Sequence, residues 1–449
     1  MIRLHAGDSN GCCDRLSRRS FLQLGAAGLT TLGLPQLLRA RDAAAKDGAP
    51  VKDTRVVLLW LEGGPSHIDL WDMKPSAPAE YRGYWRPIST NVPGMQITEM
   101  FPRQAKLADK FSIVRSLHHG DTDHIGSPHI MLTGRVGPTI ANQAATAPSM
   151  GSIVSRTVGA RRPGVPPYVV VPHVGGGKYF GAHYVGHAYD PFDVNSDPNS
   201  ASYKVQNLTL STGMSVARLD DRRGLRRSLD SLRHDADDSG AFDAMDKFEK
   251  QAFELVTSQN VSRAFDLASE TEQTRDRYGR TTWGQSTLLA RRMVEAGVSF
   301  VTVNMGGWDQ HGDLKAKMEL YLPNVDRAVS ALLQDLSARG LYEQTLVIVA
   351  GEFGRTPRAN TGFQGLPPGR DHWNNCFSLV MGGGGVKGGR IVGKTDDKAE
   401  SIIERPVTPE QLHATIYHVL GIDPSIQFVD RAGRPIPAVD GNEPIRELL

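Results

Sequence analysis

The chain has 449 residues, of which 39% are hydrophobic and 22% charged, and its 51 basic and 49 acidic side chains leave a formal net charge of +2. This length allows one large α/β domain or two to three smaller domains, and the composition excludes a disordered or collagen-like chain. The balanced charge gives neither the basic surface of a nucleic-acid-binding protein nor an acidic tail, so we expect no nucleic-acid partner.

The N-terminal segment has the pattern of an export signal. The pair Arg18-Arg19 precedes a charge-free run at residues 20–38, and small residues follow that run. A charged start, an apolar middle and a small-residue exit are typical of signal peptides, and paired arginines are typical of the twin-arginine route for folded proteins. A membrane anchor is the weaker interpretation, because glycines and threonines dilute the segment. We therefore expect a signal at 1–45, an α/β domain at 46–449 without an integral membrane segment, and a periplasmic or extracellular location.

Short apolar runs that stop at glycine or at a polar loop are typical of buried strands in a parallel sheet. Such runs occur at residues 55–61, 168–171, 298–303, 345–350 and 377–381. Their spacing along the chain leaves room for a helix between most of them. Alternating strands and helices indicate an α/β fold with a mainly parallel sheet and helices on both faces.

Three helices are the clearest in the sequence. Apolar residues recur at helical spacing over 285–296 and over 325–336, each just before a predicted strand. Near the end of the chain, Thr408, Pro409 and Gln411 offer an N-cap, a first-turn proline and a capping-box partner, and that helix is expected to end before Gly421.

A polar, charge-dense segment at 215–280 interrupts this alternation. Its helical character and scarcity of β-branched runs predict an α-helical insertion at about 205–290, with its alternating charges on a solvated face.

Ionisable residues follow the predicted strands at the points where those strands end. In open α/β sheets, ligands bind at the carboxyl ends of the strands. The residues after predicted strands are Glu62, Asp69, Asp309, His311, Glu352 and Arg355. The loop that follows Arg355 carries Arg370 and His372, and a further cluster of histidines and acids carries His124 and precedes Ser127. Each alone is more often a surface or capping residue, but together they predict a site. Sites of imidazoles and carboxylates are typical of zinc, manganese or iron, and carboxylate-rich sites are typical of magnesium, manganese or calcium. The arginines can bind phosphate or sulfate.

Five segments occur in the order GGPSHIDLWDMKP, HHGDTDHIGSPHIMLTGR, GWDQH, GEFGRTP and GRDHW. This set resembles a large bacterial family catalogued as domain of unknown function 1501, whose members often carry twin-arginine signals. That family is similar to the sulfatases of the alkaline phosphatase superfamily. The resemblance spans about residues 55–420 and implies a doubly wound, mainly parallel α/β domain with a metal site at the strand ends.

The resemblance also implies roles for particular residues. Carried over by position, Glu62 or Asp69 is the early acid, and Asp309 with His311 forms an Asp-and-His loop. Glu352 takes the acidic place of an Asp-His pair, and His372 is the later histidine. These residues are the expected ligands of a divalent metal (zinc, calcium, magnesium or manganese), in a number that the sequence leaves open.

Three departures from the family pattern bear on the metal site. His124 stands by register where sulfatases have the cysteine that becomes formylglycine, and Phe353 stands where the paired histidine is expected. The spacing from Asp309 to His311 is also shorter than usual, unless Asp313 takes part. These departures count against a two-metal site built in the usual way, and they leave a one-metal site or a degenerate binding site open.

Two functions are consistent with these residues. The first is a metal-dependent hydrolase of small-molecule or polysaccharide phosphate or sulfate esters. Its nucleophile is Ser127, Thr122 or a metal-bound water, His124 is a base or further ligand, and Arg355 binds the anion. The second is a catalytically degenerate exported scaffold that binds an anionic polysaccharide or an envelope partner. Distance discriminates between them, because ligands of one ion place their donor atoms within about 2–2.6 Å of a common point.

Overall fold

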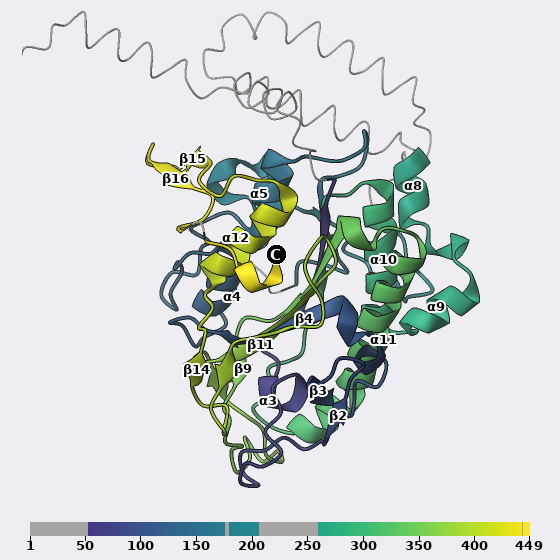
Figure 1. The fold of residues 1–449 in the computed structure, drawn as a ribbon. Helices are drawn as coiled ribbons and strands as arrows, with labels where there is room; N and C mark the ends of the chain where they lie inside the picture. Colours follow the sequence, from purple (N-terminus) through teal and green to yellow (C-terminus); the bar gives the residue numbers. More distant parts are fainter. Residues whose placement is uncertain (1–52, 176–178, 206–258, 442) are drawn as a thin grey trace, which may run out of the picture. The chain divides into compact units, whose positions relative to one another are not determined.

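The computed structural model describes residues 53–175, 179–205, 259–441 and 443–449 (Figure 1). The predicted export signal at 1–45 and most of the predicted insertion lie outside the described residues. No helix within the described ranges is long and apolar enough to cross a membrane. The fold below is that of the unit from Asp53 to Leu449.

The core of this unit is an eight-stranded sheet with the strand order β12-β4-β11-β8-β1-β7-β5-β6. Every neighbouring pair is parallel except the two pairs formed by β11, which is antiparallel to β8 and to β4. The strands are β1 Arg55–Trp60, β4 Phe111–Leu117, β5 Tyr168–Val171, β6 Phe192–Asp193, β7 Phe300–Asn304, β8 Thr345–Ala350, β11 Phe377–Gly382 and β12 Ile391–Val392. The predicted mainly parallel α/β fold is thus confirmed, whereas the prediction that the run at 377–381 is a parallel strand was wrong.

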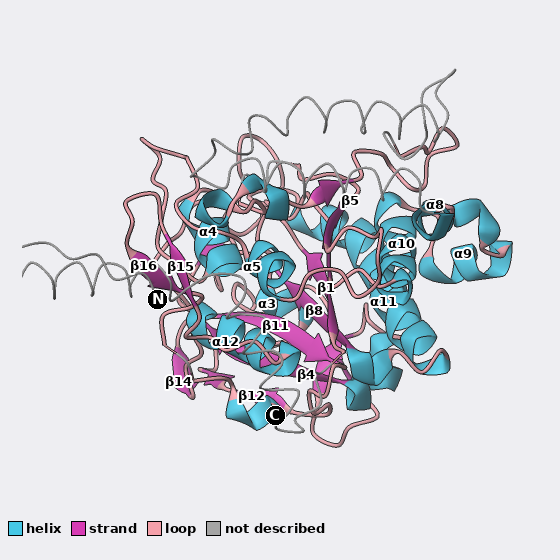
Figure 2. Ribbon diagram, turned by 90° about the horizontal axis from the view of Figure 1, so that it is seen from above, coloured by secondary structure: helices cyan, strands magenta, loops and turns pink. Residues whose placement is uncertain are grey.

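Helices cover both faces of the sheet (Figure 2). Side chains alternate along β1, so that Val57 and Leu59 pack into one core cluster and Val56 and Leu58 pack into another. The helices α10 and α11 lie on the first face, and α4, α5 and α12 lie on the second (Figures 1 and 2). The α-helices are α3 His67–Leu70, α4 Gly126–Thr133, α5 Met150–Thr157, α8 Gln259–Phe265, α9 Glu272–Tyr278, α10 Thr282–Ala296, α11 Leu314–Ala338 and α12 Pro409–Leu420.

The helix ends follow from capping residues in the sequence. Thr408 and Gln411 form the predicted capping box of α12, and Gly421 ends that helix in the left-handed region at φ 71°. The α11 helix is longer than predicted and carries Pro323 in its interior. The predicted insertion range reaches into α10, which packs against β7 and β1.

Short two-stranded ribbons and 3₁₀ helices complete the described fold. The two-stranded ribbons pair β2 Pro87–Ser89 with β3 Gln96–Thr98, β9 Gly354–Arg355 with β10 His372–Trp373, β13 Lys394–Thr395 with β14 Ile402–Glu404, and β15 Gln427–Val429 with β16 Pro435–Pro437. The 3₁₀ helices cover Gln104–Lys110, His183–Val185, His187–Tyr189, Leu267–Ser269, Tyr342–Gln344 and Arg446–Leu448. The ribbon of β9 and β10 matters most for function, because it holds Arg355 beside His372.

A buried histidine on α12 predicts acid sensitivity of the fold. The Nε2–H of His413 donates to the Met131 carbonyl at 2.9 Å, and Nδ1 is buried without a partner. Burial lowers the pKa of His413 from 6.5 to about 4. The unfolded state therefore binds more protons between these pH values, so the stability due to neutral His413 is complete above pH 6.5 and is lost as the pH falls toward 4.

The loss is at most about 3 kcal/mol, since each pKa unit corresponds to about 1.36 kcal/mol. The variant His413→Gln keeps an N–H donor for Met131 but does not titrate in this range. Urea denaturation at several pH values should show the stability advantage of the natural protein over His413→Gln shrinking as the pH falls from 7 to 4. An advantage that stays constant with pH contradicts the assignment.

Candidate metal centre

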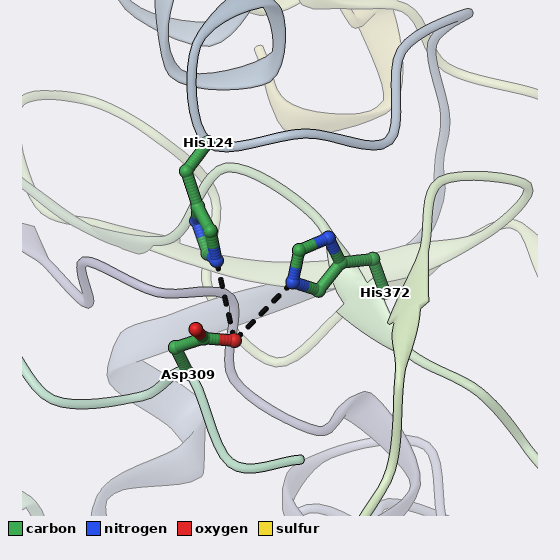
Figure 3. Close-up of side chains that lie close together, drawn as sticks. All are labelled: His124, Asp309 and His372. Carbon is green, nitrogen blue, oxygen red and sulfur yellow. Dashed lines mark hydrogen bonds and ion pairs between the residues drawn. The ribbon is translucent and has the colours of Figure 1, made fainter.

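Asp309 lies at the centre of the site, and three histidines surround its carboxylate. It follows β7, and its Oδ1 lies 3.2 Å from Nε2 of His124, 3.1 Å from Nε2 of His311 and 3.2 Å from Nε2 of His372. His124 comes from the loop before α4, and His372 lies on β10. In Figure 3, His124 and His372 point at the same carboxylate from different parts of the chain. The fold thus brings four of the predicted site residues together.

Each of these imidazoles is held by its second ring nitrogen. The Nδ1 contacts are from His124 to Glu352 Oε1 (3.0 Å), from His311 to Asp371 Oδ1 (2.6 Å) and from His372 to the Thr122 carbonyl (2.6 Å). Carboxylate and carbonyl oxygens accept hydrogen bonds, so each Nδ1 carries the proton and donates it. Each Nε2 is thereby left facing Asp309, where it can donate a proton to that carboxylate or bind a metal ion through its lone pair. Metal-binding histidines are oriented by the same kind of outer contact.

The donor set fits a divalent cation. Nε2 of His311 and Nε2 of His372 are 3.0 Å apart, and both lie beside a carboxylate oxygen, so a shared proton or a bound cation is needed between them. The ligand atoms of His124, Asp309 and His372 lie within 4.8 Å of one another. Imidazole nitrogens with one carboxylate oxygen are typical ligands of zinc, which in catalytic sites leaves one position open.

The electrostatics of the cluster favour a bound cation. Burial by itself raises the pKa of the Asp309 carboxyl, but hydrogen bonds with His124, His372 and Arg355 outweigh it and hold that pKa far below its ordinary range. Burial likewise lowers the pKa of His124, yet hydrogen bonds to Asp309 and Glu352 raise it to about 9. The carboxylates therefore stabilise positive charge at the point where the imidazoles meet.

Arg355 positions Asp309. Its side chain is fully buried, and its guanidinium donates to Oδ1 of Asp309 at 2.8 Å, to the Gly64 carbonyl at 2.8 Å, to the Arg370 carbonyl at 3.2 Å and to the Gly63 carbonyl. These internal contacts leave Arg355 little capacity for an anion from solvent. We therefore reassign it from the predicted anion site to a positioning role.

The glycine turn after β1 is a close-packed part of the site. Gly63 and Gly64 have φ values of 113° and 77°, which glycine adopts without strain. A Cβ on Gly63 would lie 2.4 Å from the backbone nitrogen of Asp309, and one on Gly64 would lie 2.4 Å from the ring of Phe353. The backbone N–H of Gly63 also donates to Oε1 of Glu352 at 2.7 Å. The turn after β1 thus contacts Asp309 and Glu352, which follow β7 and β8, the two strands that flank β1.

Asp69 and Arg370 form a separate buried ion pair. The Nε of Arg370 lies 3.1 Å from Oδ2 of Asp69, which also accepts from the Ser66 hydroxyl at 2.6 Å. The remaining donors of Arg370 bind backbone carbonyls, which belong to Thr356, Pro357, Tyr81 and Arg82. The prediction of Asp69 as a metal ligand and of Arg370 as an anion-binding residue is therefore corrected, because both side chains are enclosed and paired with each other.

The two predicted glutamate ligands lie around the cluster and do not contact Asp309. Oε1 of Glu352 accepts from His124 and from the Gly63 backbone, while its Oε2 is buried without a partner. Oε2 of Glu62 accepts from the Asn304 amide at 3.2 Å. Burial and the nearby charge of Glu352 raise the pKa of Glu62, against the lowering effect of the Asn304 bond. Glu352 thus orients His124, and Glu62 borders the site.

The two candidate nucleophilic side chains are placed differently from each other. Ser127 is fully buried in the first turn of α4, and its hydroxyl donates to Oδ1 of Asp121 at 3.3 Å. Thr122 is exposed, and its carbonyl is the acceptor that orients His372. Ser127 is therefore held away from solvent and turned toward Asp121.

The family model for proteins of unknown function DUF1501 matches residues 53–449, the unit that carries the whole cluster. The chain belongs to the DUF1501 family. The predicted resemblance to this family is thus confirmed. No curated protein matches the sequence.

Solved structures show remote likeness to this DUF1501 domain. Alkaline phosphatase from the Antarctic bacterium TAB5 is 13% identical with a TM-score of 0.36, over 82% of this chain and 98% of that one. PsFucS1 sulfatase from Pseudoalteromonas sp. is 13% identical with a TM-score of 0.39, over 87% and 72%. Ps i-CgsB, crystallised with k-i-k-neocarrahexaose, is 12% identical with a TM-score of 0.37, over 82% and 72%.

Sequence reasoning missed Asp371 and the part played by Phe353 in the DUF1501 site. Asp371 precedes a predicted ligand, yet its carboxylate contacts His311, next to the backbone bond from the Arg370 N–H to the Gln310 carbonyl. The buried Phe353 ring packs 4.4 Å from the His372 ring and 5.1 Å from the His124 ring, measured between centroids. An apolar wall thus supports these imidazoles where the family pattern led us to expect a further histidine.

The contact between Glu352 and His124 predicts a specific loss of metal affinity. In Glu352→Gln the amide oxygen still accepts from Nδ1, but the charge that stabilises the bound cation is gone, so zinc affinity should fall about 10- to 100-fold. Isothermal titration calorimetry of the full chain measures this loss. The matched variant Glu62→Gln should change zinc affinity less than about threefold, because its carboxylate binds Asn304 rather than an imidazole. Equal losses in the two variants contradict the assignment.

Proposed function

We propose that this DUF1501 domain is an exported, metal-dependent hydrolase of phosphate or sulfate esters. The observation that carries the proposal is the meeting of three imidazole Nε2 atoms within 3.2 Å of one Asp309 oxygen. The substrate is a small-molecule or polysaccharide ester, and export follows the twin-arginine signal expected at residues 1–45. A bound divalent metal supplies Lewis acidity there, which polarises an ester oxygen and lowers the pKa of water.

Some residues of the chain bind the ion, and others position the residues that bind it. His124, His372 and Asp309 hold the ion, with His311 beside them, and the 46% exposed side chain of Asp309 leaves the site open to an ester from solvent. Glu352 and Arg355 keep His124 and Asp309 in place. This donor set favours zinc or manganese over calcium or magnesium, and it favours one ion per chain.

Water is the nucleophile in this proposal. A serine nucleophile needs a nearby base or metal and access to the ester. Ser127 lacks this access, because its side chain is fully buried in the first turn of α4. Thr122 is exposed, and replacing it by valine keeps the carbonyl that orients His372. Thr122→Val should therefore retain activity, whereas a threonine nucleophile would lose it.

Metal removal and a substrate panel test the proposal. The purified protein is stripped with a chelator and then supplied with zinc, manganese, magnesium or calcium. Aryl sulfates, aryl phosphates and phosphodiesters are offered under each condition. We expect turnover of at least one ester class, its loss on chelation and its return with zinc or manganese. No turnover under any condition overturns the proposal.

A non-catalytic scaffold that binds an anionic polysaccharide or an envelope partner is the second candidate. It is favoured by the commitment of Arg355 and Arg370 to internal hydrogen bonds, which removes both predicted anion-binding side chains. The scaffold predicts metal-dependent binding of an anion such as a sulfonate without hydrolysis of any ester in the panel.

A further inference from the structure

A tight hairpin at residues 360–369 stands beside the metal centre. The Phe363 N–H donates to the Leu366 carbonyl at 3.3 Å, and the Leu366 N–H donates to the Phe363 carbonyl at 2.9 Å. The two residues between them, Gln364 and Gly365, have φ values of 50° and 79°. Positive φ at both positions is typical of the two-residue turn that best matches the twist of a hairpin. The tip therefore has a defined shape.

The hairpin is fixed to the segment that carries His311. The side-chain amide of Asn360 donates to the His311 carbonyl at 2.8 Å, and its oxygen accepts from the Gly369 N–H at 2.8 Å. The Asp313 N–H donates to the Pro367 carbonyl at 2.9 Å. These bonds on both arms of the hairpin hold its tip at a constant position relative to the imidazole.

The tip presents apolar surface to solvent at the edge of the polar cluster. Phe363 is 41% exposed and Leu366 is 46% exposed. The Phe363 ring centroid lies 5.2 Å from that of His311, whose Nε2 is 3.1 Å from Asp309. Exposed apolar side chains that occur singly are ordinary, but a rigidly held pair next to a candidate catalytic site is typical of a ligand-binding surface. An aromatic ring that is already fixed loses little conformational entropy on binding.

We propose that Phe363 and Leu366 bind the leaving group of the ester, and that this group presents a flat apolar ring face, as an aryl or pyranose ring does. The inference rests on the proposed function. The supporting observation is that His311 contacts both Asp309 and Phe363. An ester bound at the cluster therefore extends its organic part over the hairpin.

Binding of stable ester mimics tests this proposal without turnover. Zinc-loaded full-length protein is titrated calorimetrically with benzenesulfonate, with 6-deoxy-6-sulfoglucose and with methanesulfonate, and in parallel with phenylphosphonate and methylphosphonate. A ring-bearing probe should bind about fivefold more tightly than its methyl counterpart, the size expected of one aromatic contact. Phe363→Ala should remove that advantage and leave the methyl probes unchanged, while Phe363→Tyr should retain it.

The control is Val429→Ala, which shortens a 58% exposed apolar side chain on the β15–β16 hairpin and should alter nothing. An advantage for benzenesulfonate identifies an aryl leaving group, and one for the sulfoglucose identifies a pyranose. If methyl and ring probes bind equally, or if Phe363→Ala keeps the advantage, the hairpin proposal is overturned while the proposed function stands. If no probe binds the zinc-loaded natural protein, both fall together.

Discussion

Replacing Asp309 with asparagine should lower the affinity for zinc by at least about 100-fold and abolish metal-dependent hydrolysis. One oxygen of Asp309 faces the Nε2 atoms of His124, His311 and His372, so its negative charge lies at the point where the three imidazoles meet. Removing that charge leaves neutral nitrogen ligands and an amide, a weaker donor set for a divalent ion, and loss of a ligand exceeds the 10- to 100-fold effect of an outer contact. The fold should persist, because the amide oxygen still accepts from Arg355.

Calorimetric zinc titration and hydrolysis of the best ester of the panel measure these effects. Asp313→Asn is the matched control, because Asp313 sits four positions along at the start of α11 with φ 55°, a conformation that asparagine also tolerates. It should bind zinc and hydrolyse ester like the natural protein. Losses in Asp313→Asn equal to those in Asp309→Asn mean that Asp313 completes the ligand set and that the proposed set is wrong.

Replacing Arg370 with methionine should destabilise the protein by about 3–5 kcal/mol, because it leaves the buried Asp69 carboxylate without its charged partner. The four backbone carbonyls that Arg370 caps lose their donors in the same substitution, which adds to the cost. Chemical denaturation followed by circular dichroism measures the change in the free energy of unfolding.

A double-mutant cycle separates the ion pair from the carbonyl contacts. Asp69→Asn combined with Arg370→Met should be less destabilising than the sum of the two single changes, because the second substitution removes the unpaired charge left by the first. The matched control Arg446→Met breaks an exposed pair with Glu443 and should cost less than about 1 kcal/mol. If Arg370→Met unfolds like the natural protein but binds phosphate or sulfonate probes more weakly, Arg370 is an anion-binding residue after all.

The central strands were predictable because nothing in them conflicts with burial. The runs of β1 and β8 are almost wholly apolar, and both strands lie in the middle of the sheet. The strand β4 escaped notice because Ser112, Arg115 and Ser116 interrupt its apolar pattern. Those polar groups are satisfied by distant backbone carbonyls, at Lys387, Trp71 and Arg405, which no local pattern reveals. The antiparallel direction of β11 is likewise invisible in an apolar run.

Local sequence patterns likewise predict only part of the site. His124, Asp309, His311 and His372 were predictable as a group, because strand ends meet at one edge of a parallel sheet. Whether an arginine faces a ligand or the protein interior depends on what encloses it, and Arg355 and Arg370 are enclosed. Asp371 contacts a histidine sixty residues earlier in the chain, and only the fold brings that pair together.

Anomalous diffraction from a crystal of the zinc-loaded protein locates the bound ion itself. We expect one zinc peak, with Nε2 of His124, Nε2 of His372 and an oxygen of Asp309 each within about 2.0–2.2 Å of it. A zinc peak elsewhere, or no peak between these three side chains at saturating zinc, contradicts the proposed ligand set.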